Sequence, residues 1–206
     1  MIAAHLPKTR AFKSLVITSG LALLLSGCVS LGASGDPPEA LLTLSANEPL
    51  ARDSVRDATT SRALIVSLPT APRSLDTNRV PVQVDATSIA YVEQALWVDR
   101  PTRLFQSLLM ETVRTRTDRL VLPIEDAQSR EGTILSGELV NFGYDARTGE
   151  AVVTYDAVRR ERSGEVSTRR FEEREPVGNV EAAIVGQAIN SAANRATIAI
   201  ADWIGN

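Results

Sequence analysis

The side chains best suited to nucleophilic chemistry are few, and all of them lie near the start of the chain. The single histidine is His5, the only lysines are Lys8 and Lys13, and the single cysteine is Cys28. Cys28 follows Leu25-Ser26-Gly27, a branched apolar residue and two small ones, which is the pattern of a bacterial lipobox. The small residues give a signal peptidase access to the backbone, and the thiol then accepts the lipid. The sequence therefore predicts cleavage before Cys28 and lipid attachment, typically palmitate, at that residue.

The residues before Cys28 have the order of a bacterial signal peptide. Lys8, Arg10 and Lys13 form a positive region, and a mostly apolar run follows at 15–25. This run is too short to cross about 30 Å of hydrocarbon as a helix, but it has the length of a signal-peptide apolar region. We therefore expect residues 1–27 to be a signal peptide, and we set aside the alternative of a buried helix followed by a chance cysteine.

The residue after the cysteine bears on location. In well-studied Gram-negative bacteria, an Asp at that position retains a lipoprotein in the inner membrane, and here the residue is Val29. We therefore expect the mature chain to be anchored on the periplasmic side of the outer membrane. Residues 28–38, which include GASGDPP, would form the lipidated N-terminus and tether, and residues 39–206 would form one domain.

The mature chain is poorly equipped for catalysis. It has no His, no Lys and no free thiol. Their absence excludes Ser-His-Asp and Cys-His nucleophile systems, Schiff-base lysines, and zinc sites built on His or Cys. A glycosidase-like carboxylate pair remains as an alternative, although aromatic residues, which form the usual sugar platforms, are only 4% of the chain. We expect no enzyme activity, no catalytic residues, no metal and no cofactor.

The charge of the chain bears on its partners. The net charge of the whole chain is −3, and the signal carries basic but no acidic residues, so cleavage makes the mature protein more negative. This balance speaks against a nucleic-acid partner.

The apolar pattern predicts several strands and two main helices. Strands are expected at 40–45, at 63–68 (buried), at 80–84 (an edge strand, because it contains Pro81), at 88–92, at 119–123 and in a meander of 133–144, 151–160 and 165–172. One helix should begin with Asp99 as its N-cap and Pro101 in its first turn and end near 115–118. A second, alanine-rich helix should follow Asn179 as its N-cap, as a core helix first and a subunit contact second. The fold class is thus α+β, a mostly antiparallel sheet packed against two main helices in a single domain.

The meander carries many charged residues of both signs. A patch for anionic lipid headgroups is one reading of its arginines, which include Arg159, Arg160, Arg169 and Arg170. Because acidic residues alternate with them, a solvated sheet face with cross-strand ion pairs is favoured.

One run of residues carries a resemblance to a known family. It consists of Leu68-Pro69, Leu75-Asp76, Val82, Val84, Ile89, Tyr91, Trp97-Val98-Asp99 and Leu104-Phe105-Gln106-Ser107-Leu108-Leu109. With the lipobox in front and the alanine-rich helix behind, it resembles the PqiC-like auxiliary lipoprotein family of ABC-type transporters, over roughly 38–204. Trp97 is interpreted as a core residue near the first helix rather than as a partner contact.

The resemblance implies a role and partners. Such lipoproteins accompany a permease, an ATPase and a periplasmic MCE-domain protein that together move lipids between the inner and outer membranes. The chain would dock or stabilise the MCE-domain component from the outer membrane, and a homo-oligomer is plausible. The alternatives are a structural or assembly lipoprotein for another outer-membrane complex, and a carboxylate-dependent hydrolase.

Overall fold

The computed structural model describes residues 40–50, 63–127 and 132–205. By its internal contacts the chain divides into Met1–Asp36 and Pro37–Asn206, and the described residues belong to the second unit. The predicted signal peptide, Cys28 and the tether lie outside the described residues, so those assignments stay predictions.

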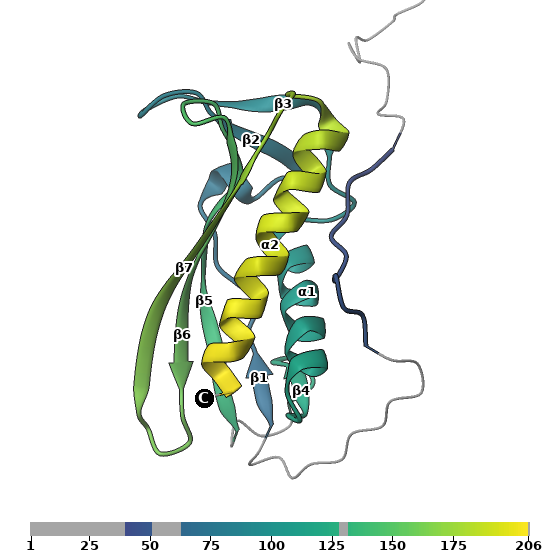
Figure 1. The fold of residues 1–206 in the computed structure, drawn as a ribbon. Coiled ribbons are helices and arrows are strands. Elements are labelled where there is room, and N and C mark those ends of the chain that lie inside the picture. Colours follow the sequence, from purple (N-terminus) through teal and green to yellow (C-terminus); the bar gives the residue numbers. More distant parts are fainter. Residues whose placement is uncertain (1–39, 51–62, 128–131, 206) are drawn as a thin grey trace, which may run out of the picture. The chain divides into compact units, whose positions relative to one another are not determined.

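The described unit is a seven-stranded sheet with two long helices (Figure 1). The strands are β1 (Leu64–Val66), β2 (Arg79–Gln83), β3 (Ile89–Leu96), β4 (Val121–Pro123), β5 (Thr133–Asp145), β6 (Glu150–Arg160) and β7 (Val166–Pro176). The helices are α1 (Pro101–Arg116) and α2 (Ala182–Gly205), with a short 3-10 turn, η2 (Arg73–Leu75). The predicted α+β class is confirmed.

The sheet is built around β5. One path runs β3-β2-β5-β1-β4, and β6 and β7 extend the sheet from β5. The long β5–β6–β7 meander and the β2–β3 hairpin are antiparallel, as predicted, whereas β1 pairs in parallel with β4 and β5, and β2 pairs in parallel with β5.

The expectation that β2 lies at a sheet edge was wrong. β2 lies between β3 and β5, and the edge is β3. Pro81 is tolerated because the β2–β5 pairing begins only at Val82, and because the register with β3 shifts between Arg79 and Pro81. The missing amide of the proline therefore falls at an irregular point of the ladder.

Both helices begin a little later than their predicted caps. Arg100 precedes α1 without a side-chain cap, and Asp99 instead accepts a hydrogen bond from the Arg100 amide at 2.7 Å. Pro101 opens the helix as predicted, because its missing N–H would be unpaired there anyway. α2 begins at Ala182, and Asn179 donates its side-chain hydrogen bond to Glu181 rather than capping the helix.

The core lies between the helices and one face of the sheet, and its largest side chains form a chain of rings. Trp97 lies 5.3 Å from Phe142, Phe105 lies 6.4 Å from Phe142, and Phe105 lies 5.1 Å from Tyr155, between ring centroids. Trp97 is only 1% exposed, so its predicted place in the core is confirmed.

Small residues let α2 lie close to its neighbours. Ala192, Ala193 and Ala196 are fully buried. The hydroxyls of Thr112 on α1 and Thr197 on α2 form a buried hydrogen bond of 3.1 Å, which satisfies both groups at the contact between the helices.

Candidate functional site

The first described segment, residues 40–50, is bound to the rest of the domain and is called the strap here. It is the purple segment of Figure 1. Leu42 donates its amide to the Leu96 carbonyl at 2.7 Å, and its carbonyl accepts from the Val98 amide at 2.8 Å. The strand expected at 40–45 is therefore reduced to a single parallel bridge, between Leu42 and Trp97.

Three residues of α2 receive the strap. Leu42 packs on Gly186, where a Cβ atom would lie 2.7 Å from the Leu42 Cδ2 atom. Further along, the Ser45 amide donates to Asn190 Oδ1 at 3.0 Å. The strap thus runs in the same direction as α2, from the start of the helix towards its middle.

Asn194 is the polar centre of this contact. Its Oδ1 accepts from the Asn47 amide at 2.8 Å, and its Nδ2 donates to the carbonyls of Ser45 and Asn190, each at 2.9 Å. The residue is only 2% exposed, so these bonds replace the water that a buried amide loses. The sequence offered one signal for this contact, two Asn residues four positions apart on a predicted helix.

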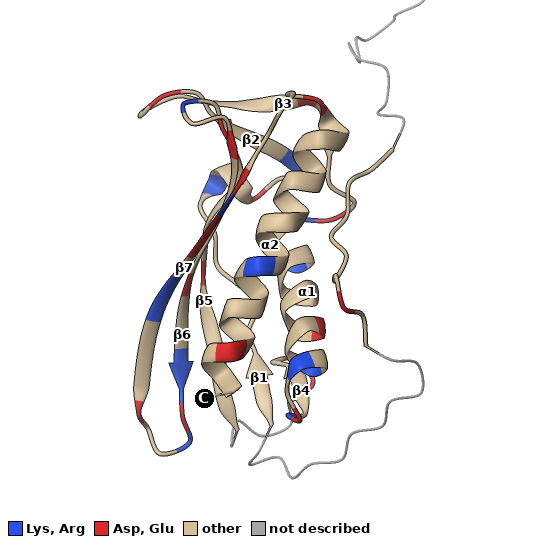
Figure 2. Ribbon diagram, viewed as in Figure 1, with Lys and Arg blue, Asp and Glu red and all other residues tan. Residues whose placement is uncertain are grey.

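Ion pairs lie on both faces of the meander. On the face away from the helices, Arg170 binds Asp156 through two contacts of 2.6 Å, and Arg174 reaches both Glu172 at 2.9 Å and Glu150 at 3.2 Å. On the opposite face, Arg195 of α2 pairs with Glu173 and Glu175 of β7. Figure 2 shows the two signs side by side along β6 and β7. The prediction of cross-strand charge pairs is confirmed for the two pairs that join β7 to β6, Arg170 with Asp156 and Arg174 with Glu150. The pairs of Arg195 join α2 to β7 instead.

A groove opens on the face of the sheet that the helices leave uncovered. Because side chains alternate along a strand, Asn141, Gly143 and Asp145 of β5 point away from the core that holds Phe142. These three residues line a hollow of about 290 Å³, together with Pro81, Gln83, Ala86 and Ile89 from the β2–β3 hairpin and Val152 and Arg174 from the sheet. Gly143 permits the narrow base, because a Cβ there would lie 2.3 Å from the Pro81 carbonyl oxygen.

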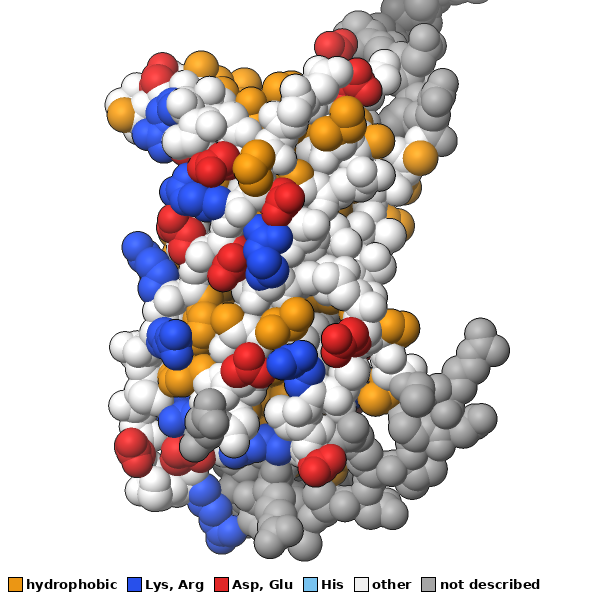
Figure 3. All heavy atoms as spheres, viewed as in Figure 1, with side chains coloured by type: hydrophobic (Ala, Val, Ile, Leu, Met, Phe, Trp, Pro, Cys, Tyr) orange, Lys and Arg blue, Asp and Glu red, His pale blue; other side chains and the backbone are white. Residues whose placement is uncertain are grey.

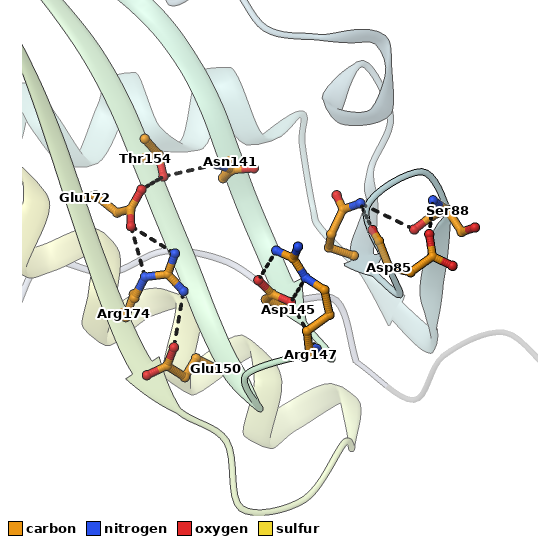
Figure 4. Close-up of polar contacts among 10 residues, drawn as sticks. Asp85, Ser88, Asn141, Asp145, Arg147, Glu150, Thr154, Glu172 and Arg174 are labelled. Atoms are coloured by element: carbon orange, nitrogen blue, oxygen red, sulfur yellow. Dashed lines mark hydrogen bonds and ion pairs between the residues drawn. The ribbon is translucent and has the colours of Figure 1, made fainter.

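The polar groups around the groove are paired with one another (Figure 4). Asp145, which is buried, accepts from Arg147 Nε at 2.9 Å, from Arg147 Nη2 at 2.7 Å and from the Arg147 amide at 3.0 Å. Asn141 donates to the Thr154 hydroxyl at 3.2 Å, and that hydroxyl donates to Glu172 at 3.1 Å. The groove walls are therefore held by a network of side chains.

The electrostatics of these carboxylates favour ion pairing. The Arg147 side chain lowers the pKa of Asp145 through its hydrogen bonds, and the Arg170 side chain lowers the pKa of Asp156 in the same way. A general acid requires the opposite shift, a raised pKa. These residues are therefore suited to holding the sheet together, and the expectation that the chain is not an enzyme stays a prediction.

Within residues 40–50, 63–127 and 132–205, no group of three or more His, Cys, Asp or Glu side chains is arranged to hold a metal ion. In the same ranges, no helix combines the length and the apolar character needed to cross a membrane. Cys28, the predicted lipid attachment site, lies outside them.

Comparison with solved structures shows the fold. A DUF330-family protein of Xanthomonas campestris is 21% identical and aligns over 82% of this chain and 94% of its own, with a TM-score of 0.60. A second crystal structure, of a protein described only as uncharacterized, is 14% identical over 73% of this chain and 96% of its own, with a TM-score of 0.62.

Comparison with sequences shows the family. None of the curated protein sequences matches the chain at a significant level. The sequence model of the ABC-type transport auxiliary lipoprotein component, in contrast, matches residues 42–201. That match begins in the strap and ends in α2, so it includes the sheet, both helices and the groove. The chain therefore belongs to the family of ABC-type transport auxiliary lipoprotein components.

Proposed function

We propose that this protein is the lipid-anchored auxiliary subunit of an ABC-type system that moves lipids between the inner and outer membranes. Cys28 carries the lipid, and the domain docks or stabilises the periplasmic MCE-domain component from the outer membrane. The observation that carries this proposal is the family match over residues 42–201, to which the lipobox at 25–28 adds the anchor.

The described contacts support an anchored, non-catalytic part. The strap, residues 40–50, follows the predicted tether almost directly and is bound to α2 through Leu42, Asn190 and Asn194. A pull from the anchor would therefore be passed into the core helix. Several acyl chains on one cysteine give stable membrane attachment, whereas a single chain gives only reversible attachment.

The test of the partner is cross-linking in intact cells, followed by purification of this lipoprotein and identification of the proteins bound to it. The control variant keeps residues 1–38 and lacks the domain, so it is anchored but cannot dock. We expect an MCE-domain protein with the full chain and none with the control. Recovery of only barrel or secretin subunits would reject the proposal in favour of an assembly lipoprotein for another outer-membrane complex.

The anchor is tested separately. In a Cys28→Ala variant the chain should leave the outer-membrane fraction, and the intact mass of the wild-type chain should show cleavage before Cys28 with added acyl groups. Native mass spectrometry of the same preparation tests whether the chain forms the homo-oligomer that the family resemblance makes plausible, and a single monomer mass would be the contrary result.

A further inference from the structure

Exposed apolar side chains gather at one end of the domain. Among the described residues, the large apolar side chains that are exposed include two in the β2–β3 hairpin, two where the strap pairs with the residues after β3, and one in the connection that leads into α2: Val84, Ile89, Leu41, Val98 and Val180. Figure 3 shows hydrophobic side chains along that upper end. Isolated exposed apolar residues need no explanation, so the place of this set relative to the anchor carries the argument that follows.

Backbone hydrogen bonds connect the segments that carry three of these residues. The Ala146 amide donates to the Gln83 carbonyl at 2.9 Å, which joins the β5–β6 turn to the β2–β3 hairpin that carries Val84 and Ile89. The Val177 amide donates to the Gly149 carbonyl at 2.9 Å, which joins the same turn to the connection that carries Val180 and leads into α2. Figure 1 shows the hairpin and the start of α2 at the same end.

The other two residues flank the strap. Leu41 precedes Leu42, which packs on Gly186 in the second turn of α2, and Val98 donates its amide to the Leu42 carbonyl. The described chain thus starts at the end where the apolar residues gather.

The tether length limits where this end can lie. Residues 29–39 separate Cys28 from Ala40, and a chain of that length spans at most about 40 Å when fully extended. As the flexible linker that its sequence predicts, it would have an r.m.s. length of about 20 Å. α2, with 24 residues, is about 36 Å long. To place the opposite end on the membrane, the tether would have to stretch almost fully along the domain.

We propose that the end formed by the β2–β3 hairpin, the strap and the start of α2 rests on the periplasmic leaflet of the membrane that holds the Cys28 lipid, with these five apolar side chains in the lipid interface. This inference rests on the anchoring in the proposed function and adds the orientation of the domain. The partner is a zwitterionic phospholipid surface, because this end carries Asp85 and Glu181, while Arg147 is paired with Asp145.

The hairpin tip is suited to this contact because its backbone is satisfied. Asp85 Oδ1 accepts from the amides of Thr87 and Ser88 at 2.8 and 2.9 Å, and the Val84 amide donates to the Ser88 carbonyl at 3.0 Å. An amide without a partner would oppose transfer out of water, and these three amides have partners within the turn.

The test uses cysteine substitution in the full lipidated protein. Because Cys28 is the only natural cysteine and is acylated, an introduced cysteine is the one free thiol for a fluorescent probe. Ile89→Cys and Val180→Cys report on the proposed end, at 49% and 50% exposure, and Val166→Cys is a matched control at 46%. Val166 pairs with Arg160, and the neighbouring Arg159 binds the Trp203 carbonyl near the end of α2, so the control lies at the opposite end.

The proteins are placed in vesicles of phosphatidylethanolamine and phosphatidylcholine that contain a lipid with a spin label in its acyl chain. We expect quenching at positions 89 and 180 to be at least threefold stronger than at 166. Equal quenching at the three positions, stronger quenching at 166, or none at 89 and 180 would overturn the orientation.

The intact mass of each protein distinguishes a wrong orientation of the domain from a missing lipid anchor. A chain without acyl groups contradicts the proposed function itself. A chain that is acylated at Cys28 but unquenched at 89 and 180 leaves the anchor standing and removes only the membrane-facing end.

Discussion

Asn194 shows how a single side chain can couple the start of the domain to its last helix. An Asn194→Ala change removes three hydrogen bonds and leaves the Asn47 amide and the Ser45 carbonyl without their partner. We expect the free energy of unfolding to fall by about 1–3 kcal/mol, and amide exchange in residues 40–50 to become faster. Urea unfolding and hydrogen exchange with mass spectrometry measure the two effects.

The matched control is Asn190→Ala. Asn190 makes one side-chain bond to the strap, at an exposed position, so its loss should cost less than the loss of Asn194. Equal effects of the two changes, or unchanged exchange in the strap, would show that Asn194 does not hold this segment.

Asp145 gives the domain a defined dependence on pH. Its pKa lies below the ordinary value of 3.8 because Arg147 binds the carboxylate. A lowered pKa stabilises the fold at pH values above 3.8, and this contribution is lost as the pH falls through the range below that value. Asp145→Asn should therefore reduce stability near pH 7 and match the wild type in strong acid.

The size of the Asp145 effect should be small. The Arg147 side chain is half-exposed, so solvent screens the pair and only a small part of the free energy of unfolding should be lost. Urea unfolding of Asp145→Asn, Arg147→Ala and the double variant across pH gives the coupling between them. A coupling that persists below the titration range would contradict an ionic origin.

At the scale of elements, the β2–β3 hairpin depends on Asp85 at its tip. Asp85→Ala removes the acceptor of the Thr87 and Ser88 amides, whereas Asp85→Asn keeps an acceptor oxygen. We expect faster amide exchange in residues 84–88 of the Ala variant alone, with the unfolding midpoint almost unchanged because the tip is exposed. Similar exchange in all three proteins would show that the turn is fixed by the strand pairing instead.

Elements with a local cause could be predicted from the sequence. The meander could be predicted from its alternating side chains and from turns at two glycines. Gly149 has a φ angle of 73° and Gly164 one of 91°, which glycine adopts without steric cost. α1 follows from Pro101 and its apolar face. The edge assignment of β2 failed because it used only Pro81, while β5, the strand that covers β2, lies 50 or more residues further along the chain.

The candidate site divides in the same way. The mixed charges of β6 and β7 predicted ion pairs, because neighbouring strands bring side chains within reach of one another. The groove could not be predicted, since its walls come from the hairpin and the sheet and its base depends on the close approach of Pro81 to Gly143. The strap contact likewise joins residues about 145 positions apart.

At the scale of the whole molecule, the strap is the segment that leads from the predicted anchor into the domain, and it is bound to the fold. Leu42 and Leu44 pack against the core, Leu42 bonds with residues on both sides of Trp97, and the family match begins at residue 42. The domain should therefore need the strap for its stability but should not need the residues before it.

Two truncated chains test this dependence. A chain of residues 37–206, which matches the second unit of the structure, should unfold cooperatively with the same midpoint as the full mature chain in detergent. A chain of residues 63–206 lacks the strap, loses the bridge between Leu42 and Trp97, and leaves Asn194 without its bonds to Ser45 and Asn47. Loss of the burial of two leucines and of these hydrogen bonds should lower the free energy of unfolding by about 2–4 kcal/mol. Urea unfolding followed by Trp fluorescence measures the difference. Equal stability of the two chains would mean that the strap contributes nothing to the fold. A pull from the anchor would then detach the strap from α2 before any force reached the helix.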